Sequence, residues 1–384
     1  MKDEKSKHTV FHLLDGRIHC GASLVTKVLV SVLRDRGVDA RLLTLYEGPV
    51  VKSARAEGMT VQVLPGSTPF SRWRGLVRLL QSVQAADRLP IVHSHQLRAN
   101  RYASLAARWT GAAHVISVHT HKEEFIRDRF PNPVKRQIIR AIHYWTLTCA
   151  NARVAVSPGV LKELQARGYD AARTQLIRNV TPLPALRMPG DDSARSVRVE
   201  WNIPDAASLV LAAGRFVPLK RFDMLLQGLA MLVRRGEHIV ILLAGDGPLR
   251  VALERLTSEL KLEENIRFLG WQQDLRAFIA ACNCAVSCSL TECSPVFLIE
   301  AMSLERPVVA AAAEDVASLV EDGKSGMLFA LDDIDGMCDA IVSVVHDTEK
   351  SERLGLAARE RVHELFDEDD SARQMSELYL AVTA

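Results

Sequence analysis

Two basic residues follow a predicted strand in the segment AAGRFVPLKRFDMLL, residues 212–226. The strand is expected to end at Gly214, with Arg215 directly after it and Lys220 just before a helix that starts near Phe222. Arginine grips phosphate oxygens bidentately, lysine adds a point charge, and the helix N-terminus supplies free N–H groups. The pattern predicts a diphosphate site, although these residues alone leave solvated surface charge as an alternative.

Two carboxylates follow in the segment SCSLTECSPVFLIEAMSLERPVV, residues 287–309. A strand is expected to end near Ser289, which places Glu292 in the loop, and a helix is expected to begin near Val296, which places Glu300 about one turn into it. A carboxylate accepts two hydrogen bonds from a cis-diol, a common way to hold a ribose. A solvated helix face is the alternative for either glutamate taken alone.

Four of the seven cysteines gather nearby, at Cys282, Cys284, Cys288 and Cys293. Zinc sites use two close pairs of ligands set apart so that four side chains converge, and this spacing does not provide them. The first three positions share parity along a strand, so they fit the buried face of a sheet. We interpret the cysteines as core residues and predict no metal site.

Parallel sheets must position these side chains, because strand-like and helix-like segments alternate along the whole chain. We predict an α/β fold of two doubly wound, Rossmann-like domains facing each other across a cleft. The N-terminal, acceptor-binding domain is expected at residues 1–185, a linker at 186–205 and the donor-binding domain at 206–365. An amphipathic helix within 366–384 is expected to pack back on the N-terminal domain. Ligands bind such sheets beyond the carboxyl ends of their strands.

Charge is unevenly distributed over the 384 residues. Residues 1–185 hold 28 Lys+Arg against 13 Asp+Glu, giving +15, and residues 186–384 hold 20 against 33, giving −13, which sum to the net charge of +2. A basic domain fits an anionic acceptor, with attraction between the two halves as the alternative. Nothing in the sequence has a nucleic-acid-binding signature.

No signal peptide and no apolar run long enough to span a bilayer occur in the sequence. We therefore expect a cytoplasmic protein. The segment FSRWRGLVRLLQ, residues 70–81, combines apolar residues at helical spacing with arginines, which favours either peripheral contact with the inner face of an anionic membrane or an ordinary helix packed on the sheet.

Several motifs together resemble the retaining nucleotide-sugar glycosyltransferases of family 4, which have the GT-B fold. The resemblance covers nearly the whole chain, more loosely in the N-terminal half, and its motifs in the C-terminal half are GRFVPLKRFDMLL, LLAGDGPL, FLGWQQDL, SLTECSPVFLIEAMSLERPVVA and LVEDGKSGMLF.

The resemblance implies a role for each matching residue. Arg215 and Lys220 match the pair that binds the donor diphosphate and neutralises the leaving group, Glu300 matches the glutamate on the ribose, and Glu292 matches the one beside the donor sugar. His119 matches a histidine near that sugar. Because the two cations stabilise the leaving group, the resemblance implies no metal and no cofactor.

Main-chain groups of the donor site are implied in the same way. These donor-binding positions are Gly21 in an N-terminal glycine loop, Gly214, the loop residues Ser294, Val296 and Phe297, and Trp271 beside the nucleobase.

Three positions depart from the family pattern. Cys20 replaces the first glycine of a Gly-Gly pair, Cys293-Ser294-Pro295 replaces a glycine-containing loop, and Glu314-Asp315 stands where glycines are usual. A proline offers no N–H, so the second departure removes a potential donor to the ligand.

We therefore predict a retaining, metal-independent glycosyltransferase. It is expected to move a sugar from a nucleoside diphosphate to a hydroxyl of a surface-glycan or lipid-linked anionic acceptor, as in lipopolysaccharide or polysaccharide biosynthesis. The alternatives are a non-catalytic GT-B module that binds a nucleotide or glycan, and a nucleotide-sugar epimerase.

Overall fold

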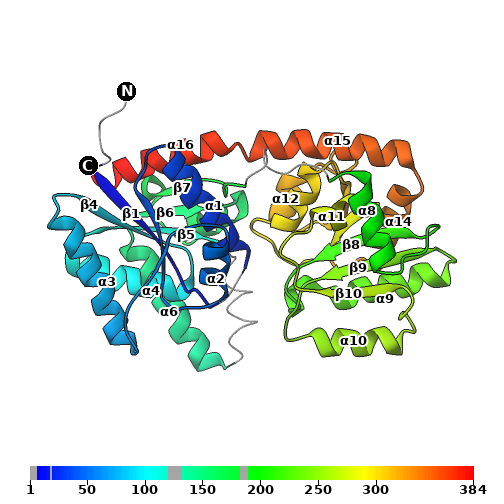
Figure 1. The fold of residues 1–384 in the computed structure, drawn as a ribbon, viewed down its shortest axis with the longest axis horizontal. Helices are drawn as coiled ribbons and strands as arrows, with labels where there is room; N and C mark the ends of the chain where they lie inside the picture. The colour runs from blue at the N-terminus through cyan, green and yellow to red at the C-terminus, as the bar shows by residue number, and fades with distance from the viewer. Residues whose placement is uncertain (1–6, 18–19, 120–131, 182–188) are drawn as a thin grey trace. The chain divides into compact units, whose positions relative to one another are not determined.

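The computed structural model describes residues 7–17, 20–119, 132–181 and 189–384. The chain divides into two compact units (Figure 1). Unit 1 comprises Met1–Pro182 together with Phe366–Ala384, and unit 2 comprises Leu183–Leu365.

Unit 1 is built on a seven-stranded parallel sheet of order β3-β2-β1-β4-β5-β6-β7. Runs of valine, isoleucine and leucine form its central strands, as expected for strands covered on both faces. The strands are β1 (His8–Leu14), β2 (Ala40–Thr44), β3 (Val61–Val63), β4 (Leu89–Ser94), β5 (Ala113–Val118), β6 (Ala152–Ala155) and β7 (Thr174–Leu176).

Helices cover both faces of this sheet. Val10 and Leu14 pack under α1, α2 and α16, whereas Phe11 and Leu13 pack under α3 and α4, because successive side chains of a strand point to opposite faces. The helical segments are α1 (Gly21–Asp35), α2 (Pro49–Ala56), α3 (Pro69–Gln84), α4 (Leu97–Thr110), α6 (Pro133–Cys149), α7 (Pro158–Ala166), the short 3₁₀ segment η1 (Ala171–Arg173) and α16 (Glu368–Ala381).

Unit 2 repeats the plan with a six-stranded parallel sheet of order β10-β9-β8-β11-β12-β13. Its strands are β8 (Ser208–Ala213), β9 (Ile239–Ala244), β10 (Ile266–Gly270), β11 (Cys284–Ser287), β12 (Val308–Ala311) and β13 (Met327–Phe329). Its helical segments are α8 (Asp191–Glu200), η3 (Pro218–Lys220), α9 (Phe222–Arg234), α10 (Arg250–Glu259), α11 (Arg276–Ala281), α12 (Val296–Ser303), α13 (Glu314–Leu319), α14 (Ile334–Val345) and α15 (Thr348–Leu365).

The predicted linker differs from the observed structure. Residues 191–200 form α8, which starts after Gly190 and packs on α11 within unit 2. The prolines that indicated a linker all precede this helix, so they mark only the start of the segment.

The C-terminal segment returns to unit 1. Helix α16 lies against α1 (Figure 1), and it places Met375, Leu378 and Tyr379 in the same core as the strand residues Val10 and Ile91. Among the described helices, none is both long enough and apolar enough to cross a membrane.

In both sheets the strand order reverses beside the first strand of the unit, between β1 and β4 and between β8 and β11. Loops leaving adjacent strands diverge at such a point and open a crevice at the carboxyl edge of the sheet. Arg215 follows β8 and Glu292 follows β11, so both lie at this edge of the unit 2 sheet.

Candidate functional site

The two predicted diphosphate cations lie in the connection between β8 and α9. Gly214 follows the last residue of β8, Arg215 is exposed, and Lys220 ends the 3₁₀ segment η3. Helix α9 begins at Phe222, as the sequence predicted. Arg215 forms no ion pair with any described residue, so its guanidinium has all its donors available for an anion.

Close backbone contacts position this connection. Gly245, at a φ of +135°, lies so near Gly214 that an added Cβ would stand 1.9 Å from the Gly214 carbonyl oxygen. A Cβ on Gly247 would stand 2.6 Å from the Phe216 oxygen, and the Phe216 ring is fully buried. Glycine is the residue that allows such approaches, so the β9 loop holds the backbone beside Arg215.

The side chains of Lys220 and Glu292 meet, although they are 72 residues apart in sequence. They form an ion pair between the Lys220 Nζ and a Glu292 carboxylate oxygen, with 24% and 13% of the respective side chains exposed. The two loops are also joined where the Leu290 N–H donates to the Leu219 oxygen at 2.9 Å. The loop after β11 therefore holds the carboxylate against the lysine.

The loop that follows Glu292 leads into α12. Cys293 is buried, and the buried Ser294 hydroxyl has no hydrogen-bond partner within the described part of the chain. The Ser294 carbonyl oxygen accepts a hydrogen bond from Val296 N at 2.9 Å, so that N–H is already used inside the loop. Phe297 is the second residue of α12.

Glu300 lies on α12 and is partly buried. Burial raises the pKa of its carboxyl group to about 7, and the negative charge of Asp274 adds to the rise while Arg276 opposes it. Asp274 and Arg276 themselves form a close ion pair at 2.6 Å. Burial removes water from this carboxylate, so hydrogen bonds from ligand hydroxyl groups would stabilise its ionised form.

The base-side edge of unit 2 is formed by the end of β10. Phe268 packs on the buried Phe216 ring at 6.3 Å between centroids. Trp271 follows the strand and is 55% exposed, after Gly270 at a φ of +68°. Its side chain is thus more than half exposed at the carboxyl edge of the sheet.

Gly21 and His119 both lie at the carboxyl edge of the sheet in unit 1. Gly21 is the first residue of α1, and His119 follows β5. His119 lines a small cavity together with His95, Ser117 and Thr26 of α1, so the end of β5 lies against the second turn of α1.

The departures from the family pattern have local structural explanations. Cys20 caps α1, where its N–H donates to the Ser23 hydroxyl at 3.0 Å, and Gln96 contacts its sulfur at 3.6 Å. Glu314 and Asp315 form the first turn of α13, where carboxylates favourably oppose the helix dipole.

The cysteine cluster is buried, in agreement with the interpretation as core. Burial raises the pKa of Cys282 and Cys288 to about 12, and it raises that of Cys284 as well. Neutral thiols are poor metal ligands. Among the described residues the cysteines form no cluster of possible metal ligands, whereas the ring nitrogens of His12, His93 and His95 do lie close together.

Sequence reasoning missed a group of cations in unit 1. The Asp15 carboxylate accepts hydrogen bonds from Arg17 at 2.8 Å and from Arg98 at 2.6 Å, and the guanidinium groups of Arg17 and Arg72 lie 3.9 and 4.2 Å from the centroid of the Tyr46 ring. Asp15 and Tyr46 follow β1 and β2 closely, a signal that could have identified the group. The local excess of positive charge suits an anionic ligand.

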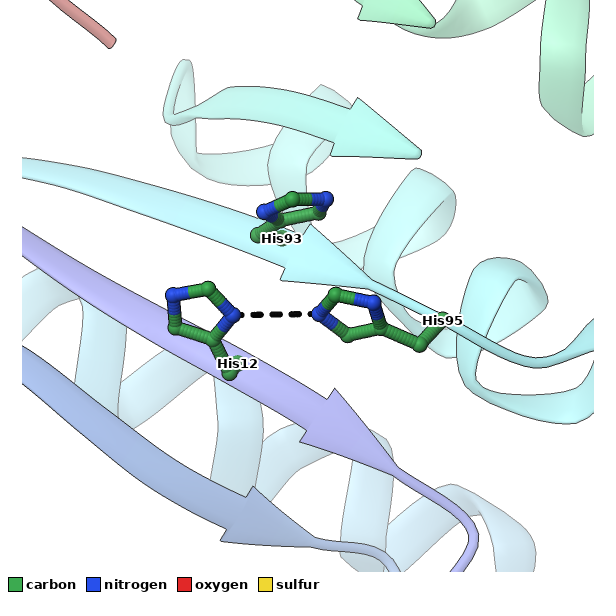
Figure 2. A group of neighbouring side chains, drawn as sticks. All are labelled: His12, His93 and His95. Atoms are coloured by element: carbon green, nitrogen blue, oxygen red, sulfur yellow. Dashed lines mark hydrogen bonds between the residues drawn. The ribbon is translucent and has the colours of Figure 1, made fainter. Parts of the chain in front are cut away.

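The histidine group was also missed. His12, His93 and His95 lie side by side (Figure 2), on the face of the sheet that packs under α1 and α16, and His93 Nε2 lies 2.8 Å from the Ser117 hydroxyl. The spacing of His93 and His95, two residues apart at the end of one strand, was the available signal.

Each of the two units matches a glycosyltransferase family model. Residues 194–361 match the model of "Glycosyl transferases group 1", and residues 21–180 match the model of "Glycosyl transferase 4-like domain".

Individual proteins agree with these matches. A D-inositol 3-phosphate glycosyltransferase of Nocardioides is 29% identical over 88% of this chain and 77% of its own length. The lipopolysaccharide core biosynthesis glycosyltransferase LpsE of Rhizobium meliloti is 31% identical over 49% of this chain and 53% of its own length. The crystal structure of Anabaena HepE in complex with UDP-glucose superposes with a TM-score of 0.85 at 20% identity, covering 97% of this chain and 99% of that chain.

The two family models together cover both units. Both relatives are glycosyltransferases; the first matches most of this chain and the second about half of it. With its two parallel-sheet units and its GT-B structural neighbours, the chain belongs to the nucleotide-sugar glycosyltransferases of the family 4 type, with the GT-B fold.

Proposed function

We propose that this protein is a retaining, metal-independent glycosyltransferase that moves a sugar from a nucleoside diphosphate to an anionic surface-glycan or lipid-linked acceptor. The observation that carries the proposal is the pairing of Lys220 with Glu292 beside the exposed Arg215. Two cations next to one carboxylate suit a site that takes a dianionic diphosphate on one side and a sugar on the other.

Cleavage of a glycosyl–diphosphate bond places negative charge on the departing phosphate. Arg215 and Lys220 would stabilise that charge, and Glu292 would hold Lys220 in place while its second oxygen accepts a hydrogen bond from the sugar. Glu300 would accept the ribose hydroxyls, and the unpartnered Ser294 hydroxyl would bond the ligand. Because the cations take over the role of a divalent ion, we propose that no metal is needed.

The nature of the donor and the acceptor is supported by the relatives and by unit 1. Solved structures of HepE contain UDP and UDP-glucose, which makes uridine diphosphate sugars the first donors to test. One relative is named for inositol 3-phosphate and others for the lipopolysaccharide core, and the Arg17, Arg72 and Arg98 group fits an acceptor that carries phosphate or carboxylate. We place the protein in the cytoplasm, in peripheral contact with an anionic membrane.

The test compares the kcat/KM for sugar transfer from a panel of nucleotide sugars between the Lys220→Ala variant and the wild type. Loss of one preorganised cation at the leaving group should lower kcat/KM at least 100-fold, about 3 kcal/mol. The matched control is Lys324→Ala, which removes a 73%-exposed lysine from its ion pair with Glu321 and should leave kcat/KM within about twofold of wild type. Equal activity of the Lys220→Ala variant and the wild type would contradict the proposal, as would conversion of the donor without any acceptor.

A further inference from the structure

His12 and His93 occupy strand positions in unit 1, and His95 directly follows β4 (Figure 2). His12 on β1 and His93 on β4 are directly opposite each other in the parallel register. Their neighbours on the same face, Val10 and Ile91, belong to the hydrophobic core, and His12, His93 and His95 are at most 3% exposed. A buried ring nitrogen without a partner costs about 1–3 kcal/mol, so each nitrogen of these rings needs a hydrogen-bond partner inside the protein.

Ring geometry indicates hydrogen bonding in preference to a shared metal ion. The His12 and His95 rings are nearly coplanar, at 14°, with His12 Nδ1 3.0 Å from His95 Nε2 (Figure 2). His93 instead stacks on His95, with 4.3 Å between centroids and 29° between planes. The lone pairs of stacked rings lie in separate planes and cannot meet at one ion.

The hydrogen bonds form a chain that ends at His119. From α16, the Tyr379 hydroxyl lies 3.3 Å from His12 Nε2, and His12 Nδ1 contacts His95 Nε2. His95 Nδ1 then lies 3.2 Å from His119 Nε2. The same Tyr379 hydroxyl lies 2.7 Å from His93 Nδ1.

Each ring in this chain carries one proton. Burial lowers the pKa of His12 to about 3 and that of His119 to about 4, and it lowers those of His93 and His95 well below the ordinary value. A neutral imidazole has one donor and one acceptor nitrogen. Because every nitrogen pair needs exactly one proton between its two atoms, the tautomer of one ring determines that of the next.

The distances around Tyr379 indicate the direction of the chain. An O–H donor makes shorter hydrogen bonds than an N–H donor, so the 2.7 Å contact fits Tyr379 donating to His93 and the 3.3 Å contact fits His12 Nε2–H donating to Tyr379. His12 Nδ1 then accepts from His95 Nε2–H. His95 Nδ1 in turn accepts from His119 Nε2–H, which leaves His119 Nδ1 without a proton.

We propose that Tyr379, His12 and His95 are positioning residues that hold His119 as its Nε2–H tautomer, so that His119 Nδ1, at the carboxyl edge of the unit 1 sheet, accepts a hydrogen bond from a hydroxyl group of a sugar ligand. This inference rests on the proposed function, in which the ligands of this protein carry sugar hydroxyl groups. It gives the C-terminal helix α16 a role in the chemistry of unit 1, because that helix supplies the hydroxyl that orders the chain.

The test measures which ring nitrogen of His119 carries the proton, by nitrogen-15 NMR of the full-length protein without donor. Loss of the His119 signals in a His119→Gln variant assigns them. In wild type we expect the proton on Nε2, and in Tyr379→Phe, which keeps the ring in the core but removes the hydroxyl, we expect a mixture of both tautomers. In donor assays the same variant should lose about tenfold in kcat with the donor KM within about twofold.

Tyr169→Phe is the matched control, since it removes the hydroxyl of another buried tyrosine of unit 1 and should change neither the His119 tautomer nor kcat. A wild-type protein with the His119 proton on Nδ1 would overturn the proposal. So would an unchanged tautomer in Tyr379→Phe, or one equivalent of zinc in the purified native protein. The NMR result does not depend on turnover, so an inactive wild type would contradict the proposed function and leave the tautomer assignment to be judged separately.

Discussion

At the residue scale, the ionised form of Glu300 lowers the stability of the folded protein, although the residue has a predicted role in binding the ribose. The carboxyl group is partly buried beside Asp274, and its raised pKa of about 7 means that ionising it in the folded protein is unfavourable. The unfolded chain holds this proton less tightly than the folded chain. The free energy of unfolding therefore falls as the pH rises from about 4.5 to about 7, and the contribution of the protonated group is fully present only below that window.

Glu300→Gln should separate the two effects. At pH 8 the variant should gain about 2 kcal/mol in free energy of unfolding, a figure reduced from the full pKa shift because the group is partly exposed, and at pH 4.5 the gain should nearly vanish. Affinity for a nucleoside diphosphate at pH 8 should fall about tenfold, since an amide is a weaker acceptor for the ribose hydroxyls.

Urea denaturation at both pH values and titration calorimetry measure these changes. An equal gain in stability at both pH values would contradict the raised pKa of Glu300 as the cause. An unchanged affinity for the nucleoside diphosphate would remove Glu300 from the nucleotide site.

At the element scale, α3 combines a face that is buried on the sheet with exposed aromatic residues, next to α4. Leu76 and Leu80 are buried on the sheet, as for an ordinary packed helix, while Phe70 is 63% and Trp109 is 69% exposed. Trp73 joins them, at 5.7 Å from the Phe70 ring and 5.8 Å from the Trp109 ring. Packing on the sheet therefore leaves an exposed aromatic cluster of Phe70, Trp73 and Trp109, with Arg74 over the Phe70 ring at 5.9 Å.

This aromatic cluster is the surface that we propose to contact the membrane, because aromatic rings beside arginines favour the interface of anionic bilayers. The wild type should sediment with vesicles that contain anionic phospholipid and far less with phosphatidylcholine alone. Replacing Phe70 and Trp109 together by serine should lower vesicle affinity about tenfold.

Val251→Ser, which removes a 77%-exposed apolar side chain from α10 in unit 2, serves as the control and should bind vesicles like the wild type. Equal sedimentation of the Phe70 and Trp109 double variant and the wild type would rule this surface out.

At the scale of the whole molecule, the chain leaves unit 1, builds unit 2 and then returns. Helix α16 completes the core of unit 1 through Met375, Leu378 and Tyr379. The last residues of the chain therefore stabilise its first strand, and a mutation there should affect one unit only.

Leu378→Ala should lower the free energy of unfolding of unit 1 by about 2–5 kcal/mol, because it leaves a cavity at a side chain that is 4% exposed. Hydrogen exchange should become faster in β1 and β4 and stay unchanged in β8 and β9. Leu380→Ala, on the same helix but 58% exposed, should leave all four strands unchanged. Faster exchange in β8 as well would show that the two units do not unfold separately.

Features set by local rules were predictable from the sequence. The start of α9 at Phe222 and of α12 at Val296 were predicted from the change of periodicity after a strand, and both are confirmed. The buried cysteines followed from their parity along a strand. The linker prediction differed from the structure at residues 191–200, which form α8. Prolines disfavour a helix at their own positions and just before them, but they do not prevent a helix from starting after the last proline.

The sequence by itself therefore determined the family motifs, the alternation of strands and helices, and the placement of Arg215 after a strand, Lys220 before a helix and Glu300 about one turn into a helix. Only the tertiary structure decided which side chains meet. Lys220 reaches Glu292 across 72 residues, and His93 reaches Tyr379 across 286. Strand parity predicts which face of a sheet a histidine occupies, but the helix that covers that face depends on the path of the chain, and here the covering helix comes from its far end.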